Sequence, residues 1–136
     1  MAWFGWALAA MVFMGVANLG MKVAGLRGAS PAGVLLWVVV GELPVALAYW
    51  LWRGRPASPP AGMAWGLMAG LVTATALILL NESFVRGAKA AVAVGIMNAN
   101  FALVALLAFL VFREQLQPSK LVGLAATLSG LWLMAR

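Results

Sequence analysis

Long apolar runs alternate with short polar breaks along the whole chain. The runs predict helices near residues 3–24, 31–52, 61–82, 88–112 and 118–135. Each is close to the roughly 20 residues that a helix needs to cross a hydrocarbon core. Pro31, Pro60 and Pro118 stand at or near predicted helix starts, where the missing N–H of proline costs little. The pattern predicts an all-α polytopic membrane protein with five transmembrane helices, forming a single transmembrane domain over residues 1–136.

The composition supports a membrane location and excludes several kinds of chemistry. Hydrophobic residues make up 65% of the chain, whereas soluble domains are about 45–50% apolar. The chain contains no Cys and no His, which removes thiol nucleophiles, imidazole bases and the usual zinc ligands. We therefore expect no metal, no cofactor and no enzymatic activity. The net charge is +6, but the basic residues are scattered at helix ends, which argues against a nucleic-acid partner.

The basic residues are divided almost evenly between the two sides of the membrane. Orientation normally follows an excess of Lys and Arg in the cytoplasmic loops, and a division of four against five gives little excess. We expect dual topology, in which copies insert both ways up. The alternative is a fixed orientation that one basic residue or an insertion partner decides. On the side of the N-terminus lie Arg53, Arg55, Arg113 and Lys120, and on the opposite side lie Lys22, Arg27, Arg86, Lys89 and Arg136.

Small residues recur at helical spacing on the predicted helices. Such residues let helix backbones approach closely in lipid. They predict helix packing, either inside one protomer or against a partner chain in a dimer. The residues concerned are Gly62, Gly66 and Gly70 on the third helix, Ala91, Gly95 and Ala99 on the fourth, and Gly123, Ala126 and Gly130 on the fifth.

Four polar side chains fall deep inside the predicted helices. Glu42 lies about 16 Å from the start of the second helix, and Asn98 and Asn100 about 15 and 18 Å from the start of the fourth. Asn18 lies about 10 Å from the end of the first helix. We expect these residues to form a substrate- or proton-binding site near the midplane, although asparagines also bond helices together through their amides. Lys22, one turn beyond Asn18, either joins this site or extends its ammonium group to the interface.

Glu42 carries the chemistry of the predicted site. A charged carboxylate at bilayer depth costs on the order of 2.5–3.5 kcal/mol on insertion scales, and ionisable groups there mark pathways or relays. Such a carboxyl can load and release a proton, or exchange it for a cationic substrate. Pro44 leaves a helical acceptor free nearby and predicts a kink. The alternative is structural, with Glu42 as a protonated acid bonded to an amide or carbonyl, or paired with Lys22.

The end of the chain resembles part of a known transporter repeat. Residues 90–136 contain an apolar helix, a short loop with Glu114, and a helix with Gly123 and Gly130 about a heptad apart. This order resembles the closing half of an EamA-type repeat in the drug/metabolite transporter superfamily. Glu114 stands just before the fifth helix, where a negative charge favours a helix N-terminus, so we expect it to act as a structural cap.

The first helix adds to the resemblance and the second departs from it. The segment MGVANLGMKVAG, residues 14–25, is similar to the family's first helix, with Gly15, Asn18 and Lys22 at matching places. Family repeats often carry an Arg in the second helix, but this chain has no basic residue there and has Glu42 about a turn further on. The substrate of better-known relatives is therefore not transferred to this chain.

The resemblance implies a function and a partner. Typical relatives contain two five-helix repeats in opposite orientation with the substrate between them, and this chain resembles one repeat. The missing half is expected to be an inverted second copy or a paired homologous repeat. We expect a proton-coupled secondary transporter that exports a small metabolite or an amphipathic, drug-like compound, as an antiparallel or parallel dimer among membrane lipids. Its expected location is a bacterial inner membrane or an archaeal plasma membrane. The alternative is a non-transporting assembly subunit or half of a heteromeric lipid-carrier translocase.

Overall fold

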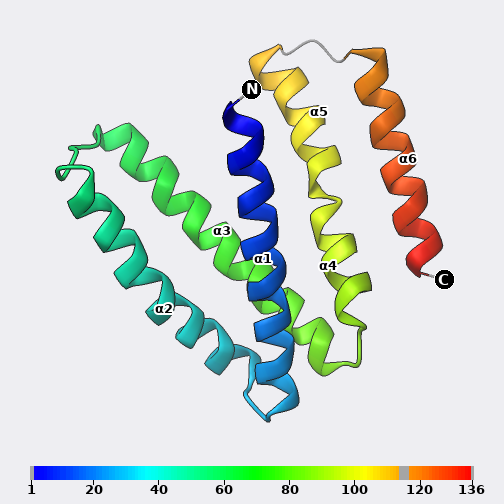
Figure 1. The fold of residues 1–136 in the computed structure, drawn as a ribbon, viewed down its shortest axis with the longest axis horizontal. Coiled ribbons are helices and arrows are strands. Elements are labelled where there is room, and N and C mark those ends of the chain that lie inside the picture. The colour runs from blue at the N-terminus through cyan, green and yellow to red at the C-terminus, as the bar shows by residue number, and fades with distance from the viewer. Residues whose placement is uncertain (1, 114–116, 136) are drawn as a thin grey trace. The chain divides into compact units, whose positions relative to one another are not determined.

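The computed structural model describes residues 2–113 and 117–135, and its regular structure is helical throughout these ranges. This confirms the all-α prediction. Two predicted helices, 31–52 and 118–135, coincide with observed ones, and the first and third run a few residues longer than expected. The helices are α1 (Ala2–Leu26), α2 (Pro31–Trp52), α3 (Pro60–Val85), α4 (Ala90–Asn98), α5 (Asn100–Phe112) and α6 (Pro118–Ala135) (Figure 1).

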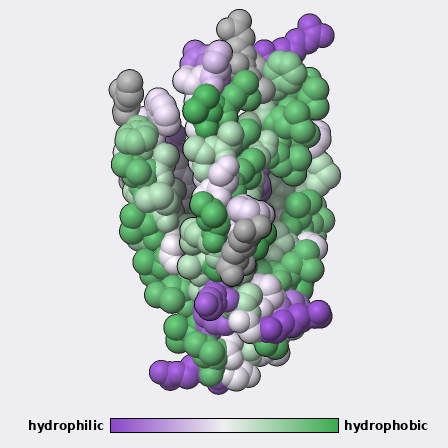
Figure 2. Space-filling model, turned by 90° about the vertical axis from the view of Figure 1, so that its right-hand side faces the viewer, coloured by the Kyte–Doolittle hydropathy of each residue, from purple (hydrophilic) through white to green (hydrophobic). Residues whose placement is uncertain are grey.

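The helices are those of a membrane protein. Within the described ranges, four segments are long and apolar enough to cross a bilayer, namely Trp3–Leu26, Pro31–Trp52, Pro60–Val85 and Ala90–Val111, and a shorter apolar helix covers Leu121–Met134. Hydrophobic side chains make up most of the visible surface in Figure 2. Apolar surface of this extent is stable in lipid but not in water, so the protein is a multi-pass membrane protein.

The chain divides into two compact units, residues 1–87 and 88–136. In the first unit, α3 contacts both α1 and α2, and α1 also contacts α2. In the second unit, α5 and α6 each contact α4. The prediction of one transmembrane domain over the whole chain stays a prediction.

The buried residues of the first unit gather at one end of it. They come from the C-terminal halves of α1 and α3 and from the first turn of α2, as with Met21, Val34 and Phe84. By contrast, every residue of 3–17 and of 39–73 is exposed. The three helices are therefore packed at the end that holds the α1–α2 loop, and their remaining surface is left for lipid or for a partner.

The helix ends explain why the chain turns where the pattern predicted. The Oγ of Ser30 accepts a hydrogen bond from the N–H of Gly33 at 3.1 Å, which caps α2 ahead of Pro31. Gly28, which follows α1, and Gly87, which follows α3, have φ values of +90° and +94°. This left-handed conformation ends a helix and is accessible to glycine without strain. An Arg precedes each of these two glycines, where its charge complements the helix C-terminus.

The fourth predicted helix, 88–112, is not continuous. It is interrupted at Ala99, which has φ −61° and ψ −6° and separates α4 from α5. The N–H of Ala99 is shared between the carbonyls of Gly95 and Ile96, at 3.1 Å each, and the N–H of Ala102 bonds the carbonyl of Ala99 at 3.0 Å. Bonds to the third residue back tighten the helix locally. The span is therefore distorted locally at Ala99, although the N–H of Ala99 keeps the regular bond to the fourth residue back, Gly95.

At Gly95, α4 and α6 lie close together. A Cβ atom built on it would lie 2.8 Å from Cδ2 of Leu131, so the glycine predicted as a packing residue contacts a neighbouring helix of its own unit. We expect Gly95→Ala to be tolerated, because the Leu131 side chain can rotate away, and Gly95→Leu to push the helices apart and lower stability by about 1–3 kcal/mol. Thermal unfolding in detergent, followed by circular dichroism, measures both variants, and equal stability of the two would contradict the packing role.

Candidate functional site

A polar cluster lies in the apolar packing of α1 against α3. Asn18 and Asn81 are buried, with 2% and 3% of their surfaces exposed. The Nδ2 group of Asn81 donates to the carbonyl of Leu77 at 2.9 Å and lies 3.6 Å from the sulfur of Met21. Asn18 lies three residues before Met21, on the same face of α1. The packing of α1 on α3 therefore carries two amide side chains at its centre.

The amide of Asn18 has no hydrogen-bond partner among the residues that the structure describes. Neither its Nδ2 nor its Oδ1 has a hydrogen bond among the described residues, although both atoms are buried. Leaving a buried polar group unpaired costs about 1–3 kcal/mol, and most buried polar groups in native proteins are paired. Asn18 therefore has hydrogen-bonding capacity that the described part of the chain does not use.

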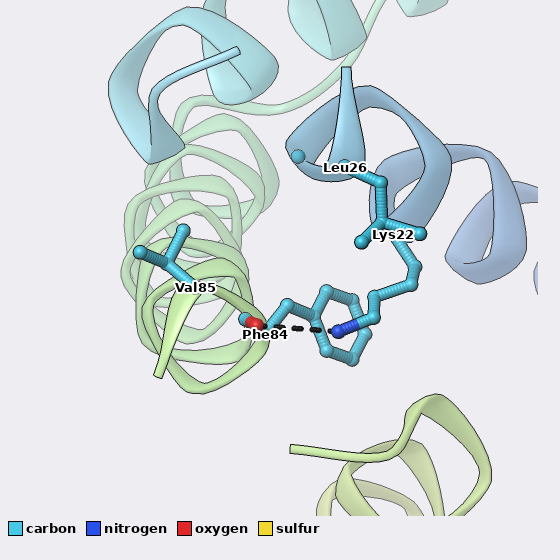
Figure 3. Close-up of a pocket in the computed structure, with 5 residues that line it drawn as sticks. Lys22, Leu26, Phe84 and Val85 are labelled. Carbon is cyan, nitrogen blue, oxygen red and sulfur yellow. Dashed lines mark hydrogen bonds between the residues drawn. The ribbon is translucent and has the colours of Figure 1, made fainter. Parts of the chain in front are cut away.

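Lys22 reaches across from α1 to the end of α3. Its Nζ donates to the carbonyl oxygen of Phe84 at 3.2 Å and lies 5.2 Å from the centroid of the Phe84 ring. Figure 3 shows the half-buried side chain crossing the ring toward this carbonyl. A cation is favourable at a helix C-terminus and over an aromatic face. The two predicted positions for the ammonium group were a midplane site and the interface. In the structure it lies at the C-terminal end of α3, beside Phe84, away from the middle of the helix.

We expect Lys22→Met to destabilise the packing of α1 on α3. Methionine keeps an apolar stem of similar length but removes both the charged donor and the cation over the ring. Hydrogen bonds to charged groups are worth about 1.5–3 kcal/mol, so the free energy of unfolding should fall by about that amount. Chemical unfolding in detergent measures the change, with Lys89→Met, an exposed lysine, as the matched control. Equal losses in the two variants would contradict the role of Lys22.

Glu42 occupies a different surface from this cluster. It lies at the middle of α2, is exposed, and has exposed neighbours on both sides along the helix. Within the described part of the chain, no cation lies within ion-pair distance of its carboxylate, because the ion pair found there joins Arg86 to Glu82 at 3.8 Å. The structural alternative of a buried pair between Glu42 and Lys22 is therefore absent from the described residues.

The two predicted site residues next to Ala99 are also accessible. Asn98 ends α4 and Asn100 begins α5, on either side of the break at Ala99, and both side chains are exposed. Pro44 lies inside α2, which continues to Trp52, and a kink there stays a prediction. Glu114, the predicted cap, lies outside the described residues.

Apart from Gly95, the predicted packing glycines are open rather than enclosed among the residues that the structure describes. A Cβ atom on Gly66, Gly70, Gly123 or Gly130 would meet no atom within 4 Å, and on Gly62 it would meet the ring of the preceding Pro59 at 3.6 Å. Ala126 is likewise exposed. These positions therefore do not mark close helix approaches inside their own units. Their use as dimer contacts stays a prediction.

Two residues of the α1–α3 cluster were not predicted. Asn81 was not among the predicted site residues; the third helix was predicted to end one residue after it, at residue 82, whereas α3 continues to Val85. Phe84 was not singled out. The spacing of Leu77, Leu80, Asn81 and Phe84 is that of one helix face, and this pattern could have placed Asn81 in the packing with α1.

Comparison with known proteins gives one match. The sequence profile of the EamA-like transporter family matches residues 1–136, which confirms the resemblance drawn from the first, fourth and fifth predicted helices. No curated protein and no solved structure matches the chain significantly. Members of the matched family are membrane transporters, which supports a non-enzymatic function at that coarse level.

Proposed function

Because the chain belongs to the EamA-like transporter family as a single repeat of the drug/metabolite transporter superfamily, we propose that it is a proton-coupled secondary transporter working as a dimer. Its substrate is a small metabolite or an amphipathic, drug-like compound. The observation that carries the proposal is the position of Glu42. This carboxyl lies at mid-span of α2 on an exposed surface, where a lone chain in lipid would leave an ionisable group facing hydrocarbon.

The free-energy cost of a charge in hydrocarbon favours a position for Glu42 that is covered by protein or hydrated. A charge at bilayer depth costs on the order of 2.5–3.5 kcal/mol on insertion scales. A second copy of the chain, or a water-filled pathway between two copies, removes that contact with lipid. The exposed glycines Gly66 and Gly70 on α3 offer a surface that another helix can approach closely. Glu42 then faces a shared interior, where its carboxyl exchanges a proton for substrate.

Two further features fit a transport cycle. The amide of Asn18 is buried with no hydrogen bond among the described residues, so it can bond a substrate or water when the cycle opens the packing of α1 on α3. The distortion at Ala99, between Asn98 and Asn100, lies inside the Ala90–Val111 span, and transporters bind substrates and ions at interruptions of membrane helices. These residues supply hydrogen bonds, while Glu42 supplies the titratable group.

Flux measurements in proteoliposomes test the transport function. A panel of small metabolites and amphipathic cations is loaded, and a pH gradient is imposed across the membrane. We expect at least one compound to move against its own gradient, and a protonophore to abolish that movement. Flux that requires a second, different membrane subunit would favour the alternative of a heteromeric assembly. Absence of gradient-driven flux for every compound, with correctly folded protein, would contradict the proposal.

Labelling of single cysteines tests the antiparallel arrangement. The natural chain has no Cys, so Ser58→Cys in the α2–α3 loop and Lys89→Cys after α3 each provide one reactive thiol. The two loops lie on opposite sides of the membrane. In dual topology, a membrane-impermeant thiol reagent labels about half of each variant from outside, as expected for two equal orientations. Complete labelling of one variant and none of the other would establish a fixed orientation and exclude the antiparallel homodimer.

A further inference from the structure

A small cavity lies between the C-terminal ends of α1 and α3. It has a volume of about 160 Å³ and is lined by Lys22, Gly25, Leu26, Phe84 and Val85. Figure 3 shows the Lys22 side chain and the Phe84 ring together at this cavity. Drug-sized ligands occupy pockets of roughly 300–1,000 Å³, so the cavity fits a single small group. It is separate from Glu42, which lies on the exposed part of α2.

The lining combines one cation with apolar walls. The ammonium group of Lys22 is fixed by the carbonyl and ring of Phe84, at 3.2 Å and 5.2 Å, so its charge is held in place. Leu26 and Val85 supply hydrocarbon, and Gly25 leaves open space where a side chain would stand. A ligand that matches these walls carries a negative group next to a hydrocarbon portion.

The depth of the cavity matches the headgroup region. Lys22 lies four residues before the end of α1, which corresponds to about 6 Å along the helix. Arg27 and Arg86 are exposed at the same end of the first unit, and the carboxylate of Glu82 is paired with Arg86 at 3.8 Å. Basic pockets between transmembrane helices at this level bind anionic lipid headgroups.

We propose that this cavity binds an anionic phospholipid, independently of the transport function proposed above. The phosphate lies beside the ammonium of Lys22, and the first carbons of the lipid contact Leu26 and Val85. The bound lipid bridges α1 and α3 at the end where the first unit is packed. A soluble phosphate ester would present the same charge but would leave the apolar walls without a matching group.

Native mass spectrometry of the delipidated protein tests the site. The protein is mixed with equal amounts of phosphatidylglycerol and phosphatidylcholine, and the two lipid adducts are compared. We expect the phosphatidylglycerol adduct to be about fivefold more abundant than the phosphatidylcholine adduct. This is the preference that the attraction of one basic residue for an anionic lipid produces at a membrane surface. Lys22→Gln should bring the ratio close to one. Arg27→Gln, which removes an exposed charge at the same end, should retain the preference.

A cavity-filling variant separates binding from folding. Gly25→Leu fills the open space, keeps Lys22 and lies within a regular helix, so it should fold and lose the preference. Retention of the preference in Gly25→Leu would overturn the proposal. Equal losses in Arg27→Gln and Lys22→Gln would also overturn it, because the effect would then be one of general surface charge. Displacement of phosphatidylglycerol by inorganic phosphate would show that the ligand is a soluble anion and would overturn the assignment to lipid.

Discussion

Proteoliposomes that contain Glu42→Gln are expected to show no pH-driven flux above that of empty liposomes. Glutamine has nearly the shape of glutamic acid and keeps its hydrogen-bonding capacity, but it neither binds nor releases a proton. Glu42 is exposed at the centre of α2, and its side chain makes no hydrogen bond or ion pair among the described residues that the replacement would remove. If the carboxyl exchanges a proton for substrate, the gradient can no longer drive transport. Downhill movement of the substrate should persist or fall, but it should lose its dependence on pH.

A second carboxylate provides the matched control for this experiment. Glu82 lies one turn before the end of α3, and its side chain, 44% exposed, is paired with Arg86. Exposed ion pairs contribute about 0–1 kcal/mol, so Glu82→Gln should leave both stability and flux close to wild type. Unchanged gradient-driven flux in Glu42→Gln would remove Glu42 from the coupling mechanism. Equal loss in both variants would point to an effect on surface charge instead.

Asn18→Leu is expected to stabilise the protein and to abolish transport. The amide of Asn18 is buried without a hydrogen-bond partner among the described residues, and leucine replaces it with an apolar group of similar size. Removing an unsatisfied buried polar group should raise the free energy of unfolding by about 1–3 kcal/mol. Transport should be lost if substrate or water uses this amide during the cycle. Opposite changes in stability and activity are typical of residues kept for function.

The neighbouring asparagine is the control for this variant. Asn81 already donates to the carbonyl of Leu77 at 2.9 Å, so Asn81→Leu removes an existing bond and should not stabilise the protein. Unfolding in detergent and flux in liposomes are measured on the same preparations. A destabilised Asn18→Leu would show that the amide has a partner in the assembled protein. If Asn18→Leu is stabilised and keeps full flux, the amide of Asn18 has no role in transport.

The membrane fold follows from features that are local in sequence. The apolar runs and their prolines predicted α2 and α6 at their observed bounds, because Pro31 and Pro118 fix the starts of both helices. The break at Ala99 was not predicted. Ala99 departs from a helix mainly in ψ, at −6°, and alanine is the best helix former. The local signal was the pair of flanking asparagines, whose side chains can compete for backbone hydrogen bonds.

The arrangement of the candidate site was less predictable than the spans. Depth along a helix can be counted from sequence, and it placed Asn18 and Glu42 well inside their helices. The direction of each side chain depends on tertiary packing, which buries Asn18 against α3 and leaves Glu42 exposed on α2. The position of Lys22 was likewise undecided, because a long flexible side chain reaches either depth. The carbonyl and ring of Phe84, 62 residues away in sequence, determine where its ammonium group lies.

Proton release on substrate binding tests the central claim most directly. A compound that the flux assay identifies as transported is added to purified protein in weakly buffered detergent solution, and the pH is followed with an indicator dye. The account predicts that wild-type protein releases protons when the compound binds and that Glu42→Gln binds without releasing any. Substrate binding with no proton release from wild type, or with equal release from Glu42→Gln, would contradict it.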